Sequence, residues 1–291
     1  LGVSTWGLLL SPIWLGLLFP QAVVYVLTFL TVYWSYMAFK HAFGLFNGYK
    51  QYQEEMAMDW YLKCQKLDFS TLPDKPTLPE NLAAVRHIII VPVVNEPEAV
   101  LKDSINSILN QTLPVSQISL VFTVEQKYSE EVINRIKGII GDREKDLSSL
   151  MFFIHPAGIP GEAIGDGGAN RAWGSSHTVE ELRNRGENIR NYIFSNIDSD
   201  HVLDKQYLAR LTHLYLTIDK RDHHFYSSAV PLFDNNLWRV PLMMRLEANS
   251  VTLGVISDWA VSKGKIRKCF YQIVCFFRSY ADTTRIFTIN I

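Results

Sequence analysis

The stretch HIIIVPVV, residues 87–94, is an almost uninterrupted run of apolar and largely β-branched residues. Such a run is typical of a strand that is buried on both faces of a parallel sheet. Apolar residues at helical spacing follow it at 97–111, and strand-like and helix-like segments then alternate along the chain. The expected strands are 117–124, 150–154 and 192–197, and the expected helices are 129–140, 169–185 and 205–218. This alternation predicts an α/β fold with a mostly parallel sheet covered on both faces.

The chain before this region has no charged residue until Lys40. A single helix over that length would measure about 58 Å, roughly twice the thickness of a bilayer core. Pro20 lies at the midpoint and breaks a helix there, so two transmembrane helices are predicted, at 3–19 and 21–40. The stretch lacks the basic start and the small-residue cleavage site of a signal peptide. Lys40, His41 and Lys50 follow the second span, which places that end in the cytoplasm.

Three regions follow from these patterns. Residues 1–42 hold the two transmembrane helices of a multi-pass protein of the cell membrane. Residues 43–84 hold an amphipathic helix at 44–68, which would lie on membrane lipid or on the domain, and a proline-containing linker at 69–84. Residues 85–291 form the α/β domain. The chain begins without Met and ends inside an apolar stretch, so we expect a truncated C-terminus.

Composition excludes several classes of protein. The net charge of the 291 residues is -1, so no basic field indicates binding to nucleic acid. The three cysteines form no CxxC pair, which argues against a disulfide framework and against a thiolate zinc site.

The most informative motif is Asp198-Ser199-Asp200, directly after the expected strand YIFSNI. Two carboxylates at a strand end suit Mg²⁺ or Mn²⁺, which also bind phosphate oxygens. An Asp-x-Asp triplet in an ordinary loop is more often a solvated turn. After a buried strand of an α/β domain, however, it lies where ligands bind. We therefore predict that Asp198 and Asp200 hold a divalent metal.

Polar residues also follow the first two expected strands. Asn95 and Glu96 come after 87–94, where they predict either the rim of a nucleotide pocket or the N-terminal cap of the next helix. Glu125 ends the second strand, where it is either an acceptor for a base N–H or an exposed charge. The loop GIPGEAIGDGGANRAW, residues 158–173, carries five glycines and opens a helix. It predicts either a phosphate-binding loop or an ordinary mobile loop.

In their order, the strings VPVVNEPEAVLKDSINSILNQTLP, FTVEQ, GGANRAW and NIDSDHVLDKQYL resemble the family 2 glycosyltransferases of the membrane-embedded kind, related to cellulose and hyaluronan synthases. This resemblance implies a GT-A fold, a Rossmann-like nucleotide-sugar domain. It also implies that Asn95, Glu96 and Glu125 line the nucleobase and ribose, that Asn170 belongs to the donor loop, and that Asp198 approaches the ribose or the metal. Asp200 would ligate the metal on the diphosphate.

Two positions depart from the family pattern. Gly167 stands where relatives carry a lysine, and Arg171 is the nearest cation that would replace it. The family's catalytic base is an Asp near an Arg, and Asp282 in ADTTR is the only candidate. A carboxylate there would accept the proton of the attacking hydroxyl.

The expected activity is therefore that of a Mn²⁺- or Mg²⁺-dependent inverting glycosyltransferase with its catalytic domain in the cytoplasm. Its partners would be a nucleotide-sugar donor, with UDP as the expected nucleotide, a glycan or lipid-linked acceptor, and membrane lipid. Two alternatives stay open. One is a transferase of sugar to a polyprenyl phosphate, and the other is an inactive, membrane-tethered nucleotide-binding or scaffold protein.

Overall fold

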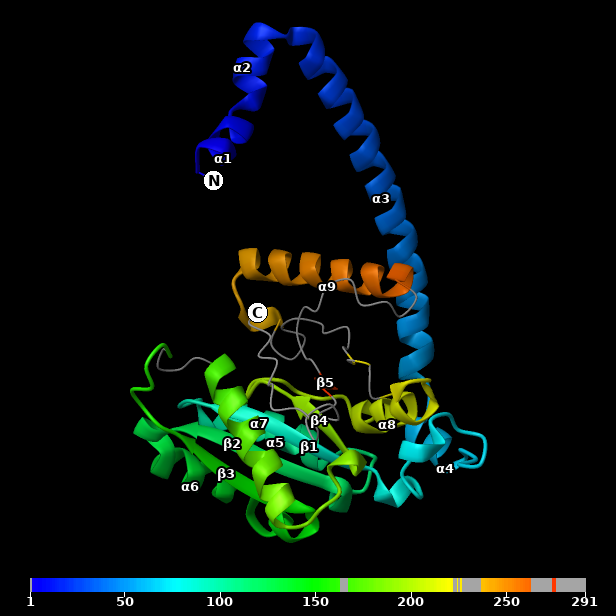
Figure 1. Ribbon diagram of the computed structural model, residues 1–291, viewed down its shortest axis with the longest axis vertical. Helices are drawn as coiled ribbons and strands as arrows, with labels where there is room; N and C mark the ends of the chain where they lie inside the picture. Colours follow the sequence, from blue (N-terminus) through cyan, green and yellow to red (C-terminus); the bar gives the residue numbers. More distant parts are fainter. Residues whose placement is uncertain are drawn as a thin grey trace. The chain divides into compact units, whose positions relative to one another are not determined.

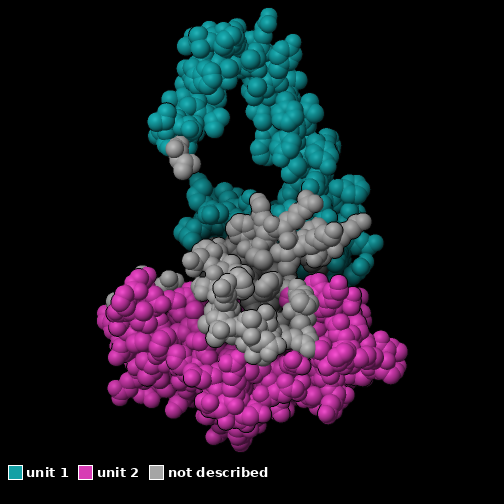
Figure 2. Space-filling view, viewed as in Figure 1, with its two compact units in different colours: residues 1–57, 229–267 teal, residues 58–228, 268–291 magenta. Residues whose placement is uncertain are grey.

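The computed structural model describes residues 2–162, 167–221, 224, 226, 237–262 and 274–275. The chain divides into two compact units, which are coloured separately in Figure 2. Unit 1 comprises residues 1–57 and 229–267, and unit 2 comprises residues 58–228 and 268–291.

The helices and strands of the described residues follow in chain order. They are α1 (Gly2–Leu9), α2 (Ser11–Leu18), α3 (Pro20–Met56), α4 (Trp60–Gln65), β1 (Arg86–Val93), α5 (Glu98–Leu109), β2 (Ile118–Glu125), α6 (Ser129–Ile140), β3 (Ser149–His155), α7 (Gly167–Asn184), β4 (Tyr192–Asn196), α8 (Tyr207–Thr217), α9 (Leu242–Ser262) and β5 (Val274–Cys275). Every strand and helix expected between residues 87 and 218 is present, with ends that move by at most a few residues.

Unit 2 is built on a sheet whose strand order is β3-β2-β1-β4-β5. The first four strands are parallel, with Ile90 opposite Val121 of β2 and opposite Asn196 of β4. The short strand β5 pairs antiparallel with β4. The predicted α/β class and mostly parallel sheet are therefore confirmed.

Helices cover both faces of the sheet (Figure 1). On β1, Ile89, Val91 and Val93 pack into one apolar cluster with α5 and α6, whereas Ile88 and Ile90 pack into another with α7. Successive side chains of a strand point to opposite faces, so the apolar run at 87–94 supplies both layers of the core at once. This double burial explains why the run shows no polar alternation.

The strand order fixes where a ligand can bind. From β1 the chain passes to β2 and β3 on one side, and then returns through α7 to β4 on the other side of β1. The carboxyl ends of β1 and β4 therefore flank the point at which the strand order reverses. In open α/β sheets this switch point is the place at which ligands bind.

The N-terminal part of unit 1 differs from the prediction. The chain does break at Pro20, where α3 begins after non-helical Phe19, and Figure 1 shows a sharp turn there. The predicted first span at 3–19, however, is divided at Leu10 into the short helices α1 and α2. Pro12 explains the division, because it lacks the N–H that would bond to Leu8 O in a continuous helix, and its ring would clash with that carbonyl, whereas the first turn of a new helix tolerates it.

Among the described residues, α3 alone is long and apolar enough to cross a membrane, with a mean hydropathy of 1.6 in its most apolar window. The prediction of an amphipathic helix at 44–68 was also inaccurate. Helix α3 continues through this region to Met56, and the separate helix α4 follows, capped by the Asp59 carboxylate, which accepts from Leu62 N.

Candidate functional site

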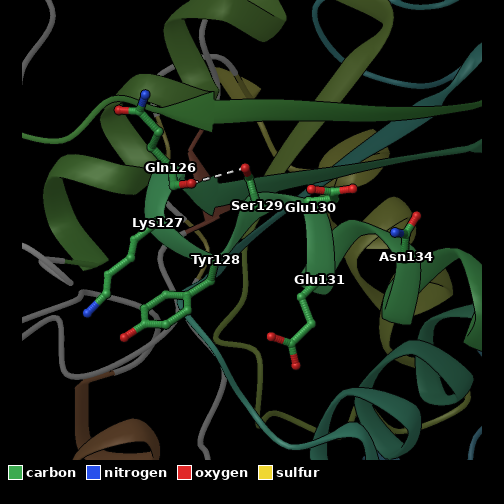
Figure 3. Close-up of a pocket in the computed structure, with 7 residues that line it drawn as sticks. All are labelled: Gln126, Lys127, Tyr128, Ser129, Glu130, Glu131 and Asn134. Carbon is green, nitrogen blue, oxygen red and sulfur yellow. Dashed lines mark hydrogen bonds between the residues drawn. The ribbon is translucent and has the colours of Figure 1, made fainter.

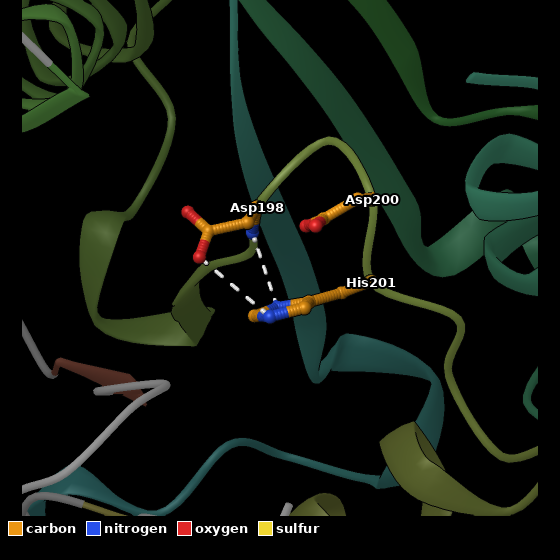
Figure 4. Close-up of side chains that lie close together, drawn as sticks. All are labelled: Asp198, Asp200 and His201. Carbon is orange, nitrogen blue, oxygen red and sulfur yellow. Dashed lines mark hydrogen bonds and ion pairs between the residues drawn. The ribbon is translucent and has the colours of Figure 1, made fainter. Parts of the chain in front are cut away.

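Three potential metal ligands lie in the turn that follows β4 (Figure 4). One ligand atom from each of Asp198, Asp200 and His201 can be chosen so that all lie within 4.8 Å of one another. The turn is held by backbone and side-chain contacts. Ile197 N donates to Ile90 O at 3.0 Å, which extends the pairing of β4 with β1, and His201 N donates to Asp198 O at 3.1 Å. The two predicted carboxylates therefore do meet, and they do so at the switch point of the sheet.

His201 is a member of this cluster that sequence reasoning missed. Its Nδ1 accepts from Asp198 N at 3.3 Å, and its Nε2 lies 3.6 Å from Asp198 Oδ2. Burial lowers the pKa of His201, and Arg171 lowers it further, while Asp200 acts in the opposite direction. A neutral imidazole is the form that binds a metal. The spacing Asp-x-Asp-His was visible in the sequence and could have drawn attention to this side chain.

Arg171 on α7 forms an ion pair with Asp198 Oδ1. Both side chains are about one-third exposed, so the pair lies at the mouth of the site rather than in the core. The guanidinium thus lies at the cluster of carboxylates, as expected if Arg171 replaces the cation missing at Gly167.

Asn170, the residue before Arg171, is fully buried. Neither oxygen nor nitrogen of its amide has a hydrogen-bond partner among the described residues. A buried amide left without partners costs free energy. This orphaned amide on the first turn of α7 is the kind of group that a bound ligand would satisfy.

The residues after β1 have structural partners. Glu96 Oε2 accepts from Val94 N at 2.8 Å, and Arg135 of α6 donates to Glu96 O at 2.6 Å and weakly to Asn95 Oδ1 at 3.4 Å. Asn95 is not the helix cap considered above, because α5 begins at Glu98 and Pro97 occupies the cap position. These contacts hold the segment Asn95-Glu96 at the carboxyl end of β1. Its role in ligand binding stays a prediction.

Glu125 is not an exposed charge, since only 2% of its surface is accessible. Its Oε1 lies 3.5 Å from Nδ1 of His155, which ends the neighbouring strand β3, and His155 Nε2 lies 3.1 Å from Glu162 Oε2. The ring of Trp173 on α7 packs edge-on against His155 at 5.6 Å between centroids. Sequence reasoning also missed His155, although its position at a strand end was the available signal.

The remaining predicted site residue, Asp282, lies outside the described residues, as do residues 163–166 of the glycine-rich loop. Figure 3 shows a separate surface pocket of about 490 Å³ at the start of α6, which is lined by seven residues between Gln126 and Asn134. None of the predicted site residues lines this pocket, so we do not connect it with the metal cluster.

The donor set of the cluster fits a divalent metal. Two carboxylates and one imidazole offer oxygen and nitrogen ligands, a combination that suits Mn²⁺ better than Mg²⁺, which prefers oxygen alone. The fit is not complete in this conformation, because one oxygen of Asp198 is engaged by Arg171. Among the described residues, Asp200 carries no such ion pair, and its side chain is exposed.

Comparison with known proteins finds structural likenesses but no sequence match. No family model matches the chain, and no curated protein matches it. Among solved structures, the chain is similar to a mannosyltransferase from Pyrobaculum calidifontis in complex with GDP-mannose and Mn²⁺, at a TM-score of 0.33 and 17% sequence identity. The match covers 69% of this chain and 49% of the mannosyltransferase, so the chain spans about half of that protein's length. We therefore base the functional proposal on the chain's own residues.

Proposed function

We propose that this chain is a metal-dependent glycosyltransferase that takes a sugar from a nucleotide-sugar donor. The observation that carries the proposal is the cluster of Asp198, Asp200 and His201 at the switch point between β1 and β4. A parallel sheet binds nucleotides at this point, and a carboxylate cluster there is suited to a metal that bridges diphosphate oxygens.

The metal would be Mn²⁺ or Mg²⁺, held by Asp200, Asp198 and His201. It would supply Lewis-acid stabilisation of the charge that develops on the departing diphosphate. Arg171 adds a fixed positive charge at the same place, and the unpartnered amide of Asn170 offers a donor and an acceptor on the first turn of α7. These groups bind and orient the diphosphate side of the donor.

The nucleoside side would be bound along the carboxyl ends of β1 and β2. Asn95 and Glu96 offer polar groups after β1, and the buried Glu125 carboxylate offers an acceptor for a base N–H at the end of β2. UDP is the nucleotide we expect. We assign the general base to Asp282, whose carboxylate would take the proton of an acceptor hydroxyl during a single in-line displacement with inversion.

The acceptor is a glycan or a lipid-linked sugar at the membrane. Helix α3 would provide the anchor, with α1 and α2 forming a second, kinked pass. The basic residues Lys40 and Lys50 after the apolar stretch favour a cytoplasmic position for the rest of the chain. These assignments agree with a donor that is made in the cytoplasm.

The test is calorimetric titration of UDP, and separately of GDP, into the full chain in detergent with and without Mn²⁺. Asp200→Asn is the test variant, and Asp103→Asn, an exposed carboxylate on α5, is the matched control. We expect metal-dependent nucleotide binding that weakens at least about tenfold in Asp200→Asn. Replacing a residue that only hydrogen-bonds to a metal ligand already lowers metal affinity by about tenfold or more, and Asp200 is itself a proposed ligand. The control should bind as the wild type does.

If neither UDP nor GDP binds to the folded chain, the proposed donor site is wrong. Binding without turnover of any nucleotide sugar would favour the nucleotide-binding scaffold. Product analysis would distinguish transfer to a glycan from transfer to a polyprenyl phosphate.

A further inference from the structure

The glycine-rich loop between β3 and α7 begins with a turn, residues 157–162, which we call the first half of the loop. Its backbone turns back on itself, since Gly158 and Gly161 have positive φ values of 83° and 88°. Glu162 N then donates to Ile159 O at 3.1 Å. Glycine adopts such φ values without steric cost. The two glycines therefore let the chain return to the strand end that it has just left.

This return brings a carboxylate onto His155, the last residue of β3. Glu162 Oε2 accepts from His155 Nε2 at 3.1 Å. The other ring nitrogen, Nδ1, faces Glu125 Oε1 at 3.5 Å. His155 and Glu125 are also opposite one another in the parallel pairing of β3 with β2. One imidazole therefore lies between a carboxylate of the sheet and a carboxylate of the loop.

The two carboxylates differ in burial. The side chains of Glu125 and His155 are 3% and 5% exposed, whereas that of Glu162 is 36% exposed. Among the ion pairs of the described residues, Glu125 takes part in one, with His155. The two atoms of this pair have no hydrogen-bond partner in the described part of the chain. Because a buried carboxylate is costly without a positive partner, the charge of His155 matters most to Glu125.

The protonation state of His155 decides how many carboxylates it can serve. A carboxylate oxygen only accepts, a neutral imidazole carries one N–H, and an imidazolium carries two. His155 therefore presents a proton to both Glu125 and Glu162 only as an imidazolium. When one proton leaves, the remaining proton stays on the side of Glu125, because the attraction is stronger where water is excluded. Glu162 then loses its donor.

The start of α7 meets the same imidazole. The ring of Trp173 packs edge-on against His155 at 5.6 Å between centroids, and His177 lies against that indole at 4.2 Å between centroids. Trp173 is uncharged, so the charged groups that face His155 in the described residues are Glu125 and Glu162. His155 therefore contacts both the first half of the loop and the helix that follows the loop.

We propose that His155, as an imidazolium, is a positioning residue that holds the first half of the glycine-rich loop at the end of β2 and beside the start of α7. The inference rests on the proposed function, in which Asn170 and Arg171 of that helix bind the diphosphate. A loop that is already ordered loses less conformational entropy when the donor binds. The contact is present at low pH and is lost as rising pH removes the proton, so nucleotide affinity should fall in the same direction.

The experiment measures hydrogen–deuterium exchange of the peptide that covers residues 157–162, by mass spectrometry of the full chain in detergent. The test variants are His155→Gln and Glu162→Gln. The matched control is Glu181→Gln, which removes an exposed ion pair with Arg185 on α7. We expect exchange to become about fivefold faster in each test variant, the upper range for a partly exposed ion pair, and to stay unchanged in the control. Titration with UDP and GDP in the presence of Mn²⁺ should show weaker binding in the two test variants alone.

A contact that only fills space would not respond to protonation. Between about pH 6 and pH 8, where an imidazole changes charge, exchange of the wild-type peptide should rise about fivefold after correction for the intrinsic rate. His155→Gln and Glu162→Gln should show no such rise. Because Glu162 is partly exposed, Glu162→Gln keeps the test decisive if His155→Gln fails to fold.

If neither substitution changes the exchange, or if the wild-type peptide does not respond to pH, His155 does not hold the loop and the proposal is wrong. Faster exchange with unchanged nucleotide affinity would show that the loop is held but does not position the donor, which also overturns the proposal. If the wild type binds neither UDP nor GDP, the proposed function fails, and the exchange data by themselves decide whether His155 holds the loop.

Discussion

Replacement of Gly174 by Ala should destabilise the α/β unit, although Ala favours helices. Gly174 lies in the middle of α7, where that helix crosses the sheet. A Cβ there would overlap Thr123 Oγ1 of β2 and would lie 3.3 Å from Thr123 Cβ and 3.4 Å from Ile90 Cγ2 of β1. The helix is therefore as close to the two central strands as a glycine allows.

The magnitude follows from two opposed terms. Inserting a methyl group into a packed core costs about 1–3 kcal/mol, and exchange of Gly for Ala within a helix gains about 1 kcal/mol. The net expectation for Gly174→Ala is a loss near 1 kcal/mol, or about 2–4 °C in Tm for a domain of this size. Gly138→Ala on α6 is the control, because nothing lies within 4 Å of its added Cβ. That control should gain up to about 1 kcal/mol from helix propensity alone.

The assay is thermal unfolding of the full chain in detergent, followed by circular dichroism. A double variant with Thr123→Ala removes the overlapping oxygen and should recover part of the loss, which a double-mutant cycle measures as coupling. If Gly174→Ala stabilises as much as Gly138→Ala, the tight packing of α7 on the sheet is refuted. Because α7 also carries Asn170 and Arg171, Gly174→Ala should weaken nucleotide binding, whereas Gly138→Ala should not.

Three further substitutions test separate contacts. Burial lowers the pKa of His87 to about 3, so its neutral form contributes stability above its unfolded pKa of about 6.5. This stability is lost as the pH falls from about 6.5 towards the folded-state pKa of about 3, by up to about 1.4 kcal/mol per pH unit. His87→Gln should therefore flatten the fall of Tm between pH 6.5 and 4, and an unchanged slope would contradict the assignment. Arg171→Gln frees an oxygen of Asp198, so calorimetry should show that Mn²⁺ alone binds up to about fivefold tighter. Nucleotide binding in the presence of Mn²⁺ should become weaker, because the positive charge is lost. An unchanged Mn²⁺ affinity would contradict competition between Arg171 and the metal for Asp198. Gly48→Ala should separate α9 from α3 and speed tryptic cleavage within α9, whereas Gly16→Ala, with nothing within 4 Å of its Cβ, should leave the digestion pattern unchanged.

The α/β unit was predictable because its signals are local. The run at 87–94 is apolar on both faces because β1 lies between two helical layers, and the same pattern marks β2. Helix α6 begins at Ser129 and ends at Ile140, as expected, since its apolar residues repeat at helical spacing and Gly141 follows with a positive φ. The order of strands was not predictable, because nothing local states on which side of β1 the strand β4 pairs.

The candidate site was likewise predictable only in part. Asp198 and Asp200 were identified from their place after a strand, a property of the chain itself. The ion pair of Arg171 with Asp198 and the contact of His155 with Glu125 join residues 27 and 30 positions apart, and they depend on how α7 and β3 are placed. Burial also excluded one of the two alternatives for Glu125, the exposed charge, because Glu125 is covered by elements that the sequence does not locate next to it.

In the N-terminal region, composition alone predicted neither the ends of the helices nor the helix that packs against α3. The absence of charge in residues 1–39 predicts apolar surroundings for all of them equally, yet Pro12 divides the first part and α3 runs on to Met56. The pattern Gly44-x-x-x-Gly48 is visible in the sequence and indicates a face for close helix packing. It does not indicate the partner, which lies more than 200 residues further along the chain at Ser257. The contact between α3 and α9 is thus specified by two glycines of one helix and by a serine in a segment of otherwise ordinary composition, so only the folded structure shows which helix the two glycines serve.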